Sequence, residues 1–250
     1  MQAQAIVDYL KQWLREQVKN ARAEGIVIGV SGGVDSSVAA AIAKQVFPDK
    51  SLGLILPCAS VPEDEAHSRL LIENIGLDYK RVDLTPVFEL FANLLETTVA
   101  SDEKNKKALR ANIKSRLRMI TLYYTAQSHN YLVLGTGNKS EATVGYFTKY
   151  GDGGVDLQIL GDLIKSEVYM LAEYLRVPEE IIKKAPSAGL WPGQTDESEM
   201  GVSYPELAKY ILGEKVSEEN FNLISSLAGM SHHKRTMPPI AKIPAEIRGL

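Results

Sequence analysis

A short apolar run that leads directly into a glycine turn restricts the fold of this chain most. Residues 26–30 are mainly β-forming apolar residues, and they are followed by Ser31-Gly32-Gly33-Val34-Asp35-Ser36-Ser37. Apolar residues then recur at four-residue spacing from Val38 until Pro48, which predicts a helix. A strand that is apolar at nearly every position is typical of one buried on both faces. The segment therefore predicts a buried strand, a tight turn and an amphipathic helix.

This strand–helix unit recurs along the chain. Buried, apolar strand-like runs at 51–57 and 131–136 and a more exposed strand at 79–84 alternate with helical patterns. Such alternation predicts βαβ units and a doubly wound parallel sheet flanked by helices, an α/β fold in one domain. Sheets of this kind bind ligands beyond the carboxyl ends of their strands. The turns that follow residues 30 and 134 are both expected at that edge.

Three segments fall outside this alternation. Residues 98–111 are small and charged without apolar periodicity, so we expect a mobile surface loop. The glycine-rich stretch 145–161 is also expected to be a loop. Helices near 204–212 and 217–229 precede a basic, proline-rich C-terminal tail, residues 230–250.

Composition excludes several classes of protein. The 250 residues contain 28 Lys and Arg against 31 Asp and Glu, which argues against a general nucleic-acid binder. Cys58 is the only cysteine, so neither an internal disulfide nor a cysteine-rich metal site is expected. No apolar run approaches the roughly 18 residues of a membrane helix, and the first residues do not resemble a signal peptide. We therefore expect a cytoplasmic protein without membrane or nucleic-acid partners.

The turn at 31–37 carries the clearest chemical signal. Its glycines allow the backbone to approach a ligand closely, and the following helix presents free N–H groups to an anion such as phosphate. The serine hydroxyls add donors. Because Asp35 would repel a phosphate, a bridging cation such as Mg²⁺ is implied. The motif lacks the lysine of the ATPase phosphate loop, and a plain serine-capped turn is the alternative interpretation.

The turn resembles the pyrophosphate-binding SGGxDS loop of the ATP pyrophosphatases, which split ATP between its α- and β-phosphates and adenylate a substrate oxygen. The chain also contains the stretches Asn112–Met119, Gly135–Glu141, Gly145–Asp152, Pro186–Trp191, Gly193–Glu197 and His233–Arg235. These stretches are similar to NAD synthetases, and the resemblance runs from about residue 5 to about residue 240. It implies a Rossmann-like fold of the adenine nucleotide alpha hydrolase type over residues 1–250.

The resemblance also implies roles for individual residues. Catalytic roles fall to Asp35, Lys165 and Asp152, of which Asp152 would handle ammonium, and Mg²⁺ ligation falls to Asp35 and Glu141. The implied ATP-binding residues are Val30, Ser31, Gly32, Gly33, Val34, Asp35, Ser36, Ser37, Arg116, Thr136, Lys165 and Ser187. Those implied for deamido-NAD⁺ are Tyr146, Phe147, Lys149, Asp152, Asp156, His233 and Lys234. Without the resemblance, most of these would be ordinary surface charges or core aromatics.

The activity that the resemblance implies is ATP-dependent amidation of deamido-NAD⁺ to NAD⁺, with release of AMP and pyrophosphate, by a homodimeric ligase. The resemblance uses nearly all 250 residues, and Cys58 has no amidase motif around it. Ammonia is therefore the expected nitrogen donor, in place of a glutaminase domain. Two alternatives remain open: a tRNA-thiolating or other adenylating relative, and a non-catalytic nucleotide sensor of the same fold.

Overall fold

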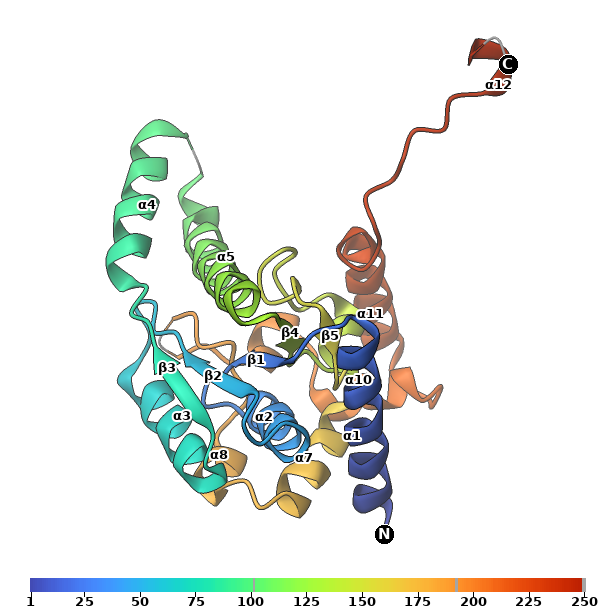
Figure 1. Cartoon of the computed structure of the whole chain (residues 1–250). Coiled ribbons are helices and arrows are strands. Elements are labelled where there is room, and N and C mark those ends of the chain that lie inside the picture. The colour runs from blue at the N-terminus through green and yellow to red at the C-terminus, as the bar shows by residue number, and fades with distance from the viewer. Residues whose placement is uncertain (101, 192, 249–250) are drawn as a thin grey trace.

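A five-stranded parallel sheet forms the centre of the computed structural model, which describes residues 1–100, 102–191 and 193–248. The strand order is β3-β2-β1-β4-β5, and every neighbouring pair is parallel (Figure 1). The order reverses direction between β1 and β4, as in a doubly wound sheet. The predicted fold class is therefore confirmed. The strands are β1 (Gly25–Gly29), β2 (Ser51–Ile55), β3 (Asp78–Arg81), β4 (Tyr131–Gly135) and β5 (Leu157–Gln158).

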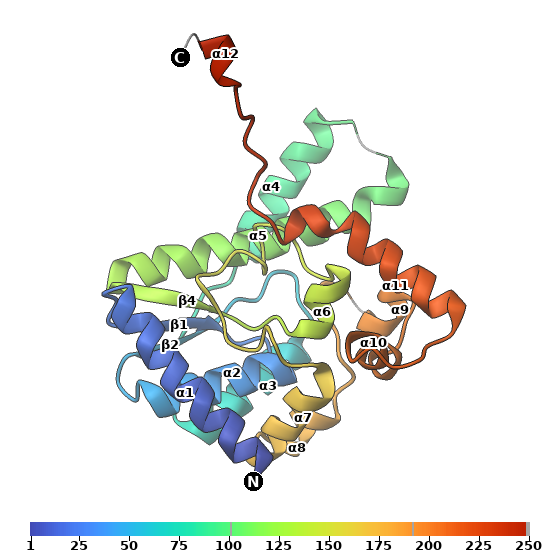
Figure 2. The ribbon, with the colours of Figure 1, turned by 90° about the vertical axis from the view of Figure 1, so that its right-hand side faces the viewer.

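Helices cover both faces of this sheet, and Figure 2 shows them as two layers. One layer contains α1 (Gln2–Asn20), α2 (Val34–Val46), α3 (Pro62–Ile75), α7 (Lys165–Tyr174) and α8 (Glu179–Lys183). Its apolar side chains pack with Ile26 and Ile28 of β1 in one core. The opposite layer contains α4 (Thr85–Thr98) and α5 (Glu103–His129), which pack on Val27 and Val133. Because successive β1 residues point to opposite faces, the continuous apolar run supplies both cores.

A third apolar cluster lies beside the carboxyl edge of the sheet. Val144 packs there with Met200, Leu207 and Ile224. This cluster joins segments that are distant in sequence and brings their polar residues toward the end of β4. The helices are α6 (Lys139–Val144), α9 (Asp196–Met200), α10 (Tyr204–Ile211) and α11 (Glu218–Met230).

The loop predicted at 98–111 is wrong over residues 103–111, which form the first turns of α5. Asp102 caps this helix by accepting a hydrogen bond from the Lys104 N–H. Arg110 then pairs with Glu96 at 2.8 Å and with Glu89 at 2.9 Å on α4. A helix stabilised by charges on its neighbour has no apolar stripe, so its pattern resembles that of a loop. Ser101 lies outside the described residues.

After α11 the chain forms a short 3₁₀ helix, η1 (His232–Lys234), which contacts the body of the molecule through Lys234. The segment that follows extends away from the body and ends in a terminal helix, α12 (Ala245–Arg248) (Figure 1). Residues 249 and 250 of the predicted tail lie outside the described part. No helix in the described ranges is long and apolar enough to cross a membrane.

Candidate active site

The glycine turn after β1 requires glycine at one position. Gly32 has φ +76°, and a Cβ there would lie 2.4 Å from the Asp64 carbonyl oxygen. Gly33 is extended, and a Cβ there would meet only Ser31 Oγ at 3.5 Å. The turn leads into α2, whose first N–H groups have no partner within the helix. The predicted strand–turn–helix therefore presents backbone donors at the carboxyl edge of the sheet.

The three serines of the turn do not act alike. Ser36 and Ser37 are buried, and both hydroxyls donate to the Gly33 carbonyl, at 3.0 and 2.8 Å. Ser31 is exposed, and its Oγ lies 3.0 Å from Ser36 Oγ. The hydroxyl that faces a ligand most openly is therefore that of Ser31, while the other two brace the turn.

A charged centre lies next to this turn. Lys165, at the start of α7, is only 3% exposed. Its Nζ lies 2.5 Å from Asp35 Oδ2 and 3.7 Å from Glu141 Oε1. Burial opposes its charge, but the two carboxylates outweigh burial and raise the pKa of Lys165. Three of the four residues that sequence reasoning selected for catalysis and metal binding therefore meet at one point, and the fourth, Asp152, is not among them.

Asn138, which sequence reasoning missed, fixes the two carboxylates relative to each other. Its Nδ2 donates to Asp35 Oδ1 at 2.8 Å. Its Oδ1 accepts from the Glu141 N–H, and Glu141 Oε2 accepts from the Asn138 N–H, so the pair forms the capping box of α6. Burial, and then the charge of Asp35, raise the pKa of Glu141 to about 8. The Asn-x-x-Glu spacing is a signal that could have revealed this role.

Two further residues complete the centre from α9 and α10. Tyr204 donates to Asp196 Oδ2 at 2.7 Å, and its hydroxyl is 3.5 Å from Glu141 Oε1. The Tyr204 ring centroid is 5.0 Å from Lys165 Nζ. Asp196 is 4% exposed, and burial raises its pKa. The helices that meet in the third apolar cluster therefore contribute both a third carboxylate, from α9, and an aromatic face, from α10.

The turn and the charged centre line a single cavity of about 440 Å³. Most of the predicted site residues are in its wall: Val30, Ser31, Gly33, Val34, Asp35, Ser36, Thr136, Glu141, Tyr146, Phe147, Asp152, Lys165, Ser187 and Lys234. The remaining predicted residues are outside that lining: Gly32, Ser37, Arg116, Lys149, Asp156 and His233.

Asp152 and Asp156 have different surroundings. Asp152 Oδ1 accepts from the Ser115 hydroxyl at 2.6 Å and from the Thr148 N–H at 3.0 Å. Asp156 accepts from the Val133 N–H at 2.8 Å and from the Tyr123 hydroxyl at 3.1 Å. Asp152 is thus held at the cavity wall, whereas both oxygens of Asp156 are engaged by the protein.

Three of the residues outside the lining, Arg116, Lys149 and His233, contact one another. Lys149 donates to the His233 carbonyl at 2.5 Å, and Arg116 donates to the Lys149 carbonyl at 3.3 Å. The structure joins them across the 145–151 segment and η1 without bringing them into the large cavity.

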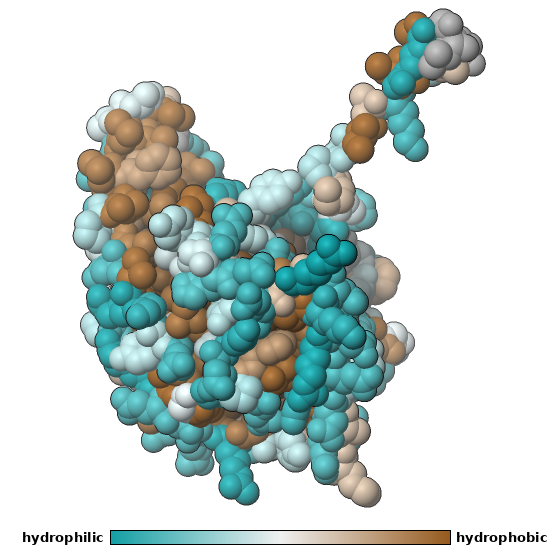
Figure 3. All heavy atoms as spheres, viewed as in Figure 1, coloured by the Kyte–Doolittle hydropathy of each residue, from teal (hydrophilic) through white to brown (hydrophobic). Residues whose placement is uncertain are grey.

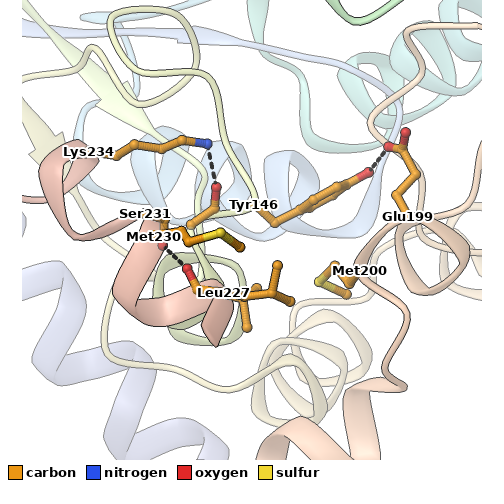
Figure 4. Close-up of a pocket in the computed structure, with 9 residues that line it drawn as sticks. Tyr146, Glu199, Met200, Leu227, Met230, Ser231 and Lys234 are labelled. Atoms are coloured by element: carbon orange, nitrogen blue, oxygen red, sulfur yellow. Dashed lines mark hydrogen bonds between the residues drawn. The ribbon is translucent and has the colours of Figure 1, made fainter. Parts of the chain in front are cut away.

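A smaller cavity of about 250 Å³ adjoins the first, and Tyr146, Glu199 and Lys234 line both. Figure 4 shows Tyr146 pointing to Glu199, which accepts from its hydroxyl at 2.7 Å. On the opposite side, Lys234 donates to the Gly145 and Phe147 carbonyls, each at 2.8 Å. Burial lowers the pKa of Lys234.

Comparison with known protein families assigns the chain to one family. The family model described as NAD synthase matches residues 6–238. The chain belongs to the NAD synthase family. Among curated members, it is 54% identical to the NH(3)-dependent NAD(+) synthetase of Syntrophomonas wolfei, over 99% of this chain and 100% of that protein.

Solved structures of similar sequence have the same fold. NMN synthetase from Francisella tularensis is 39% identical, with a TM-score of 0.91 over 96% of this chain and 99% of that one. The NH3-dependent NAD synthetase of Campylobacter jejuni, solved with nitrate, is 28% identical, with a TM-score of 0.79 over 97% and 100%. The alignment with each of these two structures therefore includes nearly the whole chain, the sheet and the site among it.

Proposed function

We propose that this protein catalyses the ATP-dependent amidation of deamido-NAD⁺ by ammonia, with NAD⁺, AMP and pyrophosphate as products. One observation carries the proposal: the phosphate-type turn and the Lys165 centre line one cavity in a member of the NAD synthase family. The likeness to NH3-dependent synthetases over the whole chain supports ammonia as the donor.

The chemistry follows from the fact that a carboxylate has no good leaving group and is therefore a poor acyl donor. An oxygen of the nicotinate carboxylate attacks the α-phosphorus of ATP, and the bond from that phosphorus to the pyrophosphate oxygen breaks. Ammonia then attacks the acyl carbon, and AMP leaves with the electron pair of the former carboxylate oxygen. The turn N–H groups and Lys165 would hold the phosphates and neutralise the charge that develops on them, so that catalysis rests on positioning and electrostatics.

Mg²⁺ would be held by Asp35 and Glu141. Both carboxylates already converge on one cationic group, the Lys165 ammonium, at 2.5 and 3.7 Å, and carboxylate oxygens are the ligands that Mg²⁺ prefers. The ion would neutralise phosphate charge when it is bound. Asp35→Asn should weaken the Mg²⁺ dependence of turnover, and an unchanged Mg²⁺ titration would count against these ligands.

The nicotinate end would lie toward Tyr146, Phe147 and Lys234, which line the cavity. Asp152 is our candidate for receiving ammonium, because Oδ1 is held by Ser115 and Thr148 while Oδ2 accepts no hydrogen bond from the described part of the chain. Arg116, Lys149, Asp156 and His233 remain candidate dinucleotide contacts outside the large cavity.

A second candidate substrate is nicotinate mononucleotide. The NMN synthetase of F. tularensis superposes with a TM-score of 0.91, against 0.79 for the C. jejuni NAD synthetase. The purified protein should therefore be given ATP, Mg²⁺ and ammonium with each substrate in turn, and amide and pyrophosphate measured. A higher kcat/KM for deamido-NAD⁺ supports the first proposal. A higher value for the mononucleotide supports the second, and no turnover with either supports a sensor.

We also propose that the protein is a cytoplasmic homodimer. Its proposed substrates, ATP and deamido-NAD⁺, support the location. An exposed apolar face on α4 supports the dimer: Val87, Leu90, Phe91 and Leu94 are all exposed, and Figure 3 shows hydrophobic side chains gathered over this helix. A contiguous apolar patch of this kind is typical of an interface, and a second copy of the chain would cover it.

A further inference from the structure

A buried lysine on α5 has no part in the chemistry proposed above. Lys114 is 7% exposed, and no carboxylate of the described residues forms an ion pair with it. Burial lowers its pKa. A buried ammonium without a counter-ion is costly unless hydrogen bonds satisfy it, so its contacts indicate what it does.

Its two acceptors are backbone carbonyls on two separate segments. Lys114 Nζ donates to the Ala59 carbonyl at 3.1 Å and to the Leu190 carbonyl at 2.8 Å. Ala59 belongs to the segment that follows β2, and Leu190 to the segment that precedes α9. Both segments contribute to the wall of the large cavity, through Pro57 and Ser60 and through Pro186–Trp191 respectively.

Both acceptors are also held by other groups. Ala59 has φ +48°, a left-handed conformation that is unfavourable for alanine and persists only where its surroundings impose it. Its N–H donates to Thr85 Oγ1 at 3.0 Å. The Leu190 N–H donates to Gln194 Oε1 at 2.8 Å. The backbone is therefore held in place at both acceptors, and Lys114 links the two segments.

Both segments are linked to the phosphate turn through the start of α3, which follows residues 57–60 in the chain and lies beside Gly189. The Asp64 carbonyl lies 2.4 Å from the Cβ position of Gly32, and Asp64 Oδ2 lies 2.9 Å from that of Gly189. Asp64 also pairs with Lys184 at 2.5 Å. The start of α3 is therefore packed between the turn and the 186–191 segment, so a shift of either wall segment would alter the space beside the turn.

We propose that Lys114 is a positioning residue that ties residues 57–60 to residues 186–191 and thereby shapes the ATP end of the cavity. The proposal rests on the proposed function, because it assigns ATP to this end. Lys114 does not touch the reacting atoms. It acts through the Leu190 and Ala59 carbonyls on wall residues such as Ser60 and Ser187.

The test compares wild type with Lys114→Met, which keeps the aliphatic stem and removes the three donors, and with Lys114→Arg, which keeps donors for both carbonyls. Lys215→Met, on an exposed loop, controls for loss of one positive charge. The measurements are kcat and KM for ATP and for deamido-NAD⁺, the affinity for ATP with Mg²⁺ by calorimetry, hydrogen exchange over 186–191, and thermal unfolding.

For Lys114→Met we expect KM and Kd for ATP to rise about tenfold, the scale of losing one charge-assisted hydrogen bond. Hydrogen exchange of the backbone amides over residues 186–191 should become faster. The values of kcat and of KM for deamido-NAD⁺ should stay near those of wild type. Lys114→Arg should recover most of the ATP affinity.

Two results would overturn the proposal. One is unchanged ATP affinity and unchanged exchange in Lys114→Met. The other is a joint fall of kcat, ATP affinity and melting temperature that Lys114→Arg does not restore, which is the mark of a purely structural role. Calorimetry and exchange need no turnover, so a failure of the proposed amidation would be seen separately, in the wild-type protein.

Discussion

Lys165 is the single side chain on which the proposed chemistry depends most. It is the one ammonium that contacts both Asp35 and Glu141 in the described structure, and it is 3% exposed. Lys165→Ala should lower turnover about 100-fold, the scale for losing one donor to the transition state. Steady-state kinetics would show this, with exposed Lys183→Ala as the control. Near-normal turnover in Lys165→Ala would remove its assigned role.

Glu141 should make stability depend on pH when no divalent cation is present. Burial and Asp35 raise its pKa to about 8 in the folded protein, so the unfolded chain binds fewer protons than the folded one between about pH 4.5 and 8. The free energy of unfolding should therefore fall as pH rises through this window.

Denaturant unfolding at several pH values in EDTA would measure this fall. Glu141→Gln should flatten the dependence, because it removes the titrating group, whereas Glu180→Gln, at an exposed position of α8, should leave it as in wild type. An equally steep dependence in Glu141→Gln would show that another group is responsible.

The sequence alone predicted part of the charged centre around Lys165. Asp35 and Glu141 belong to motifs that carry the family resemblance, the same resemblance gave Lys165 its role, and the three residues do meet. Tyr204 and Asp196 were not predicted as site residues, because they reach the centre only through the packing of α9 and α10 against α6. Tertiary packing between distant segments leaves no periodic signal in the sequence.

At the scale of elements, the turn between β1 and α2 offers a matched pair of variants. Gly32→Ala forces a side chain into φ +76° and against the Asp64 carbonyl, whereas Gly33→Ala meets only Ser31 Oγ at 3.5 Å. We expect Gly32→Ala to lower the free energy of unfolding by about 1–3 kcal/mol, the usual cost of such strain, and Gly33→Ala to cost much less. Equal stability of the two variants in denaturant unfolding would contradict this reading of the turn.

Elements with an apolar pattern could be predicted, whereas the first turns of α5 and strand β5, which have none, could not. The buried strands β1, β2 and β4 have continuous apolar runs. The first turns of α5 depend on ion pairs to α4 rather than on an apolar stripe, and they were expected to be a loop. Strand β5 is only two residues long and gains its place by pairing with β4, so it has no pattern of its own.

At the scale of the whole molecule, the apolar face of α4 predicts association. Leu90 is 74% exposed, and a charge there would oppose burial against a second copy. Leu90→Glu should halve the mass measured by sedimentation equilibrium and leave the circular dichroism unchanged. Leu212→Glu, an exposed leucine outside α4, should keep the wild-type mass. A dimer that survives Leu90→Glu, or a wild-type monomer, would place the interface elsewhere or remove it.

The overall architecture followed from the alternation of strands and helices, because that pattern restricts the topology to a parallel, doubly wound sheet. The strand order and the third apolar cluster did not follow from it. The order depends on which crossover each helix makes, and the cluster on contacts among α6, α10 and α11.

The most direct test of the proposed reaction is the fate of oxygen from the substrate carboxylate. Deamido-NAD⁺ labelled with ¹⁸O at both carboxylate oxygens would be incubated with the protein, ATP, Mg²⁺ and ammonium, and the products analysed by mass spectrometry. We expect one ¹⁸O in AMP, one in the amide of NAD⁺ and none in pyrophosphate, because the carboxylate attacks the α-phosphorus. Unlabelled AMP, or label in pyrophosphate or inorganic phosphate, would contradict adenylation of the carboxylate by this protein.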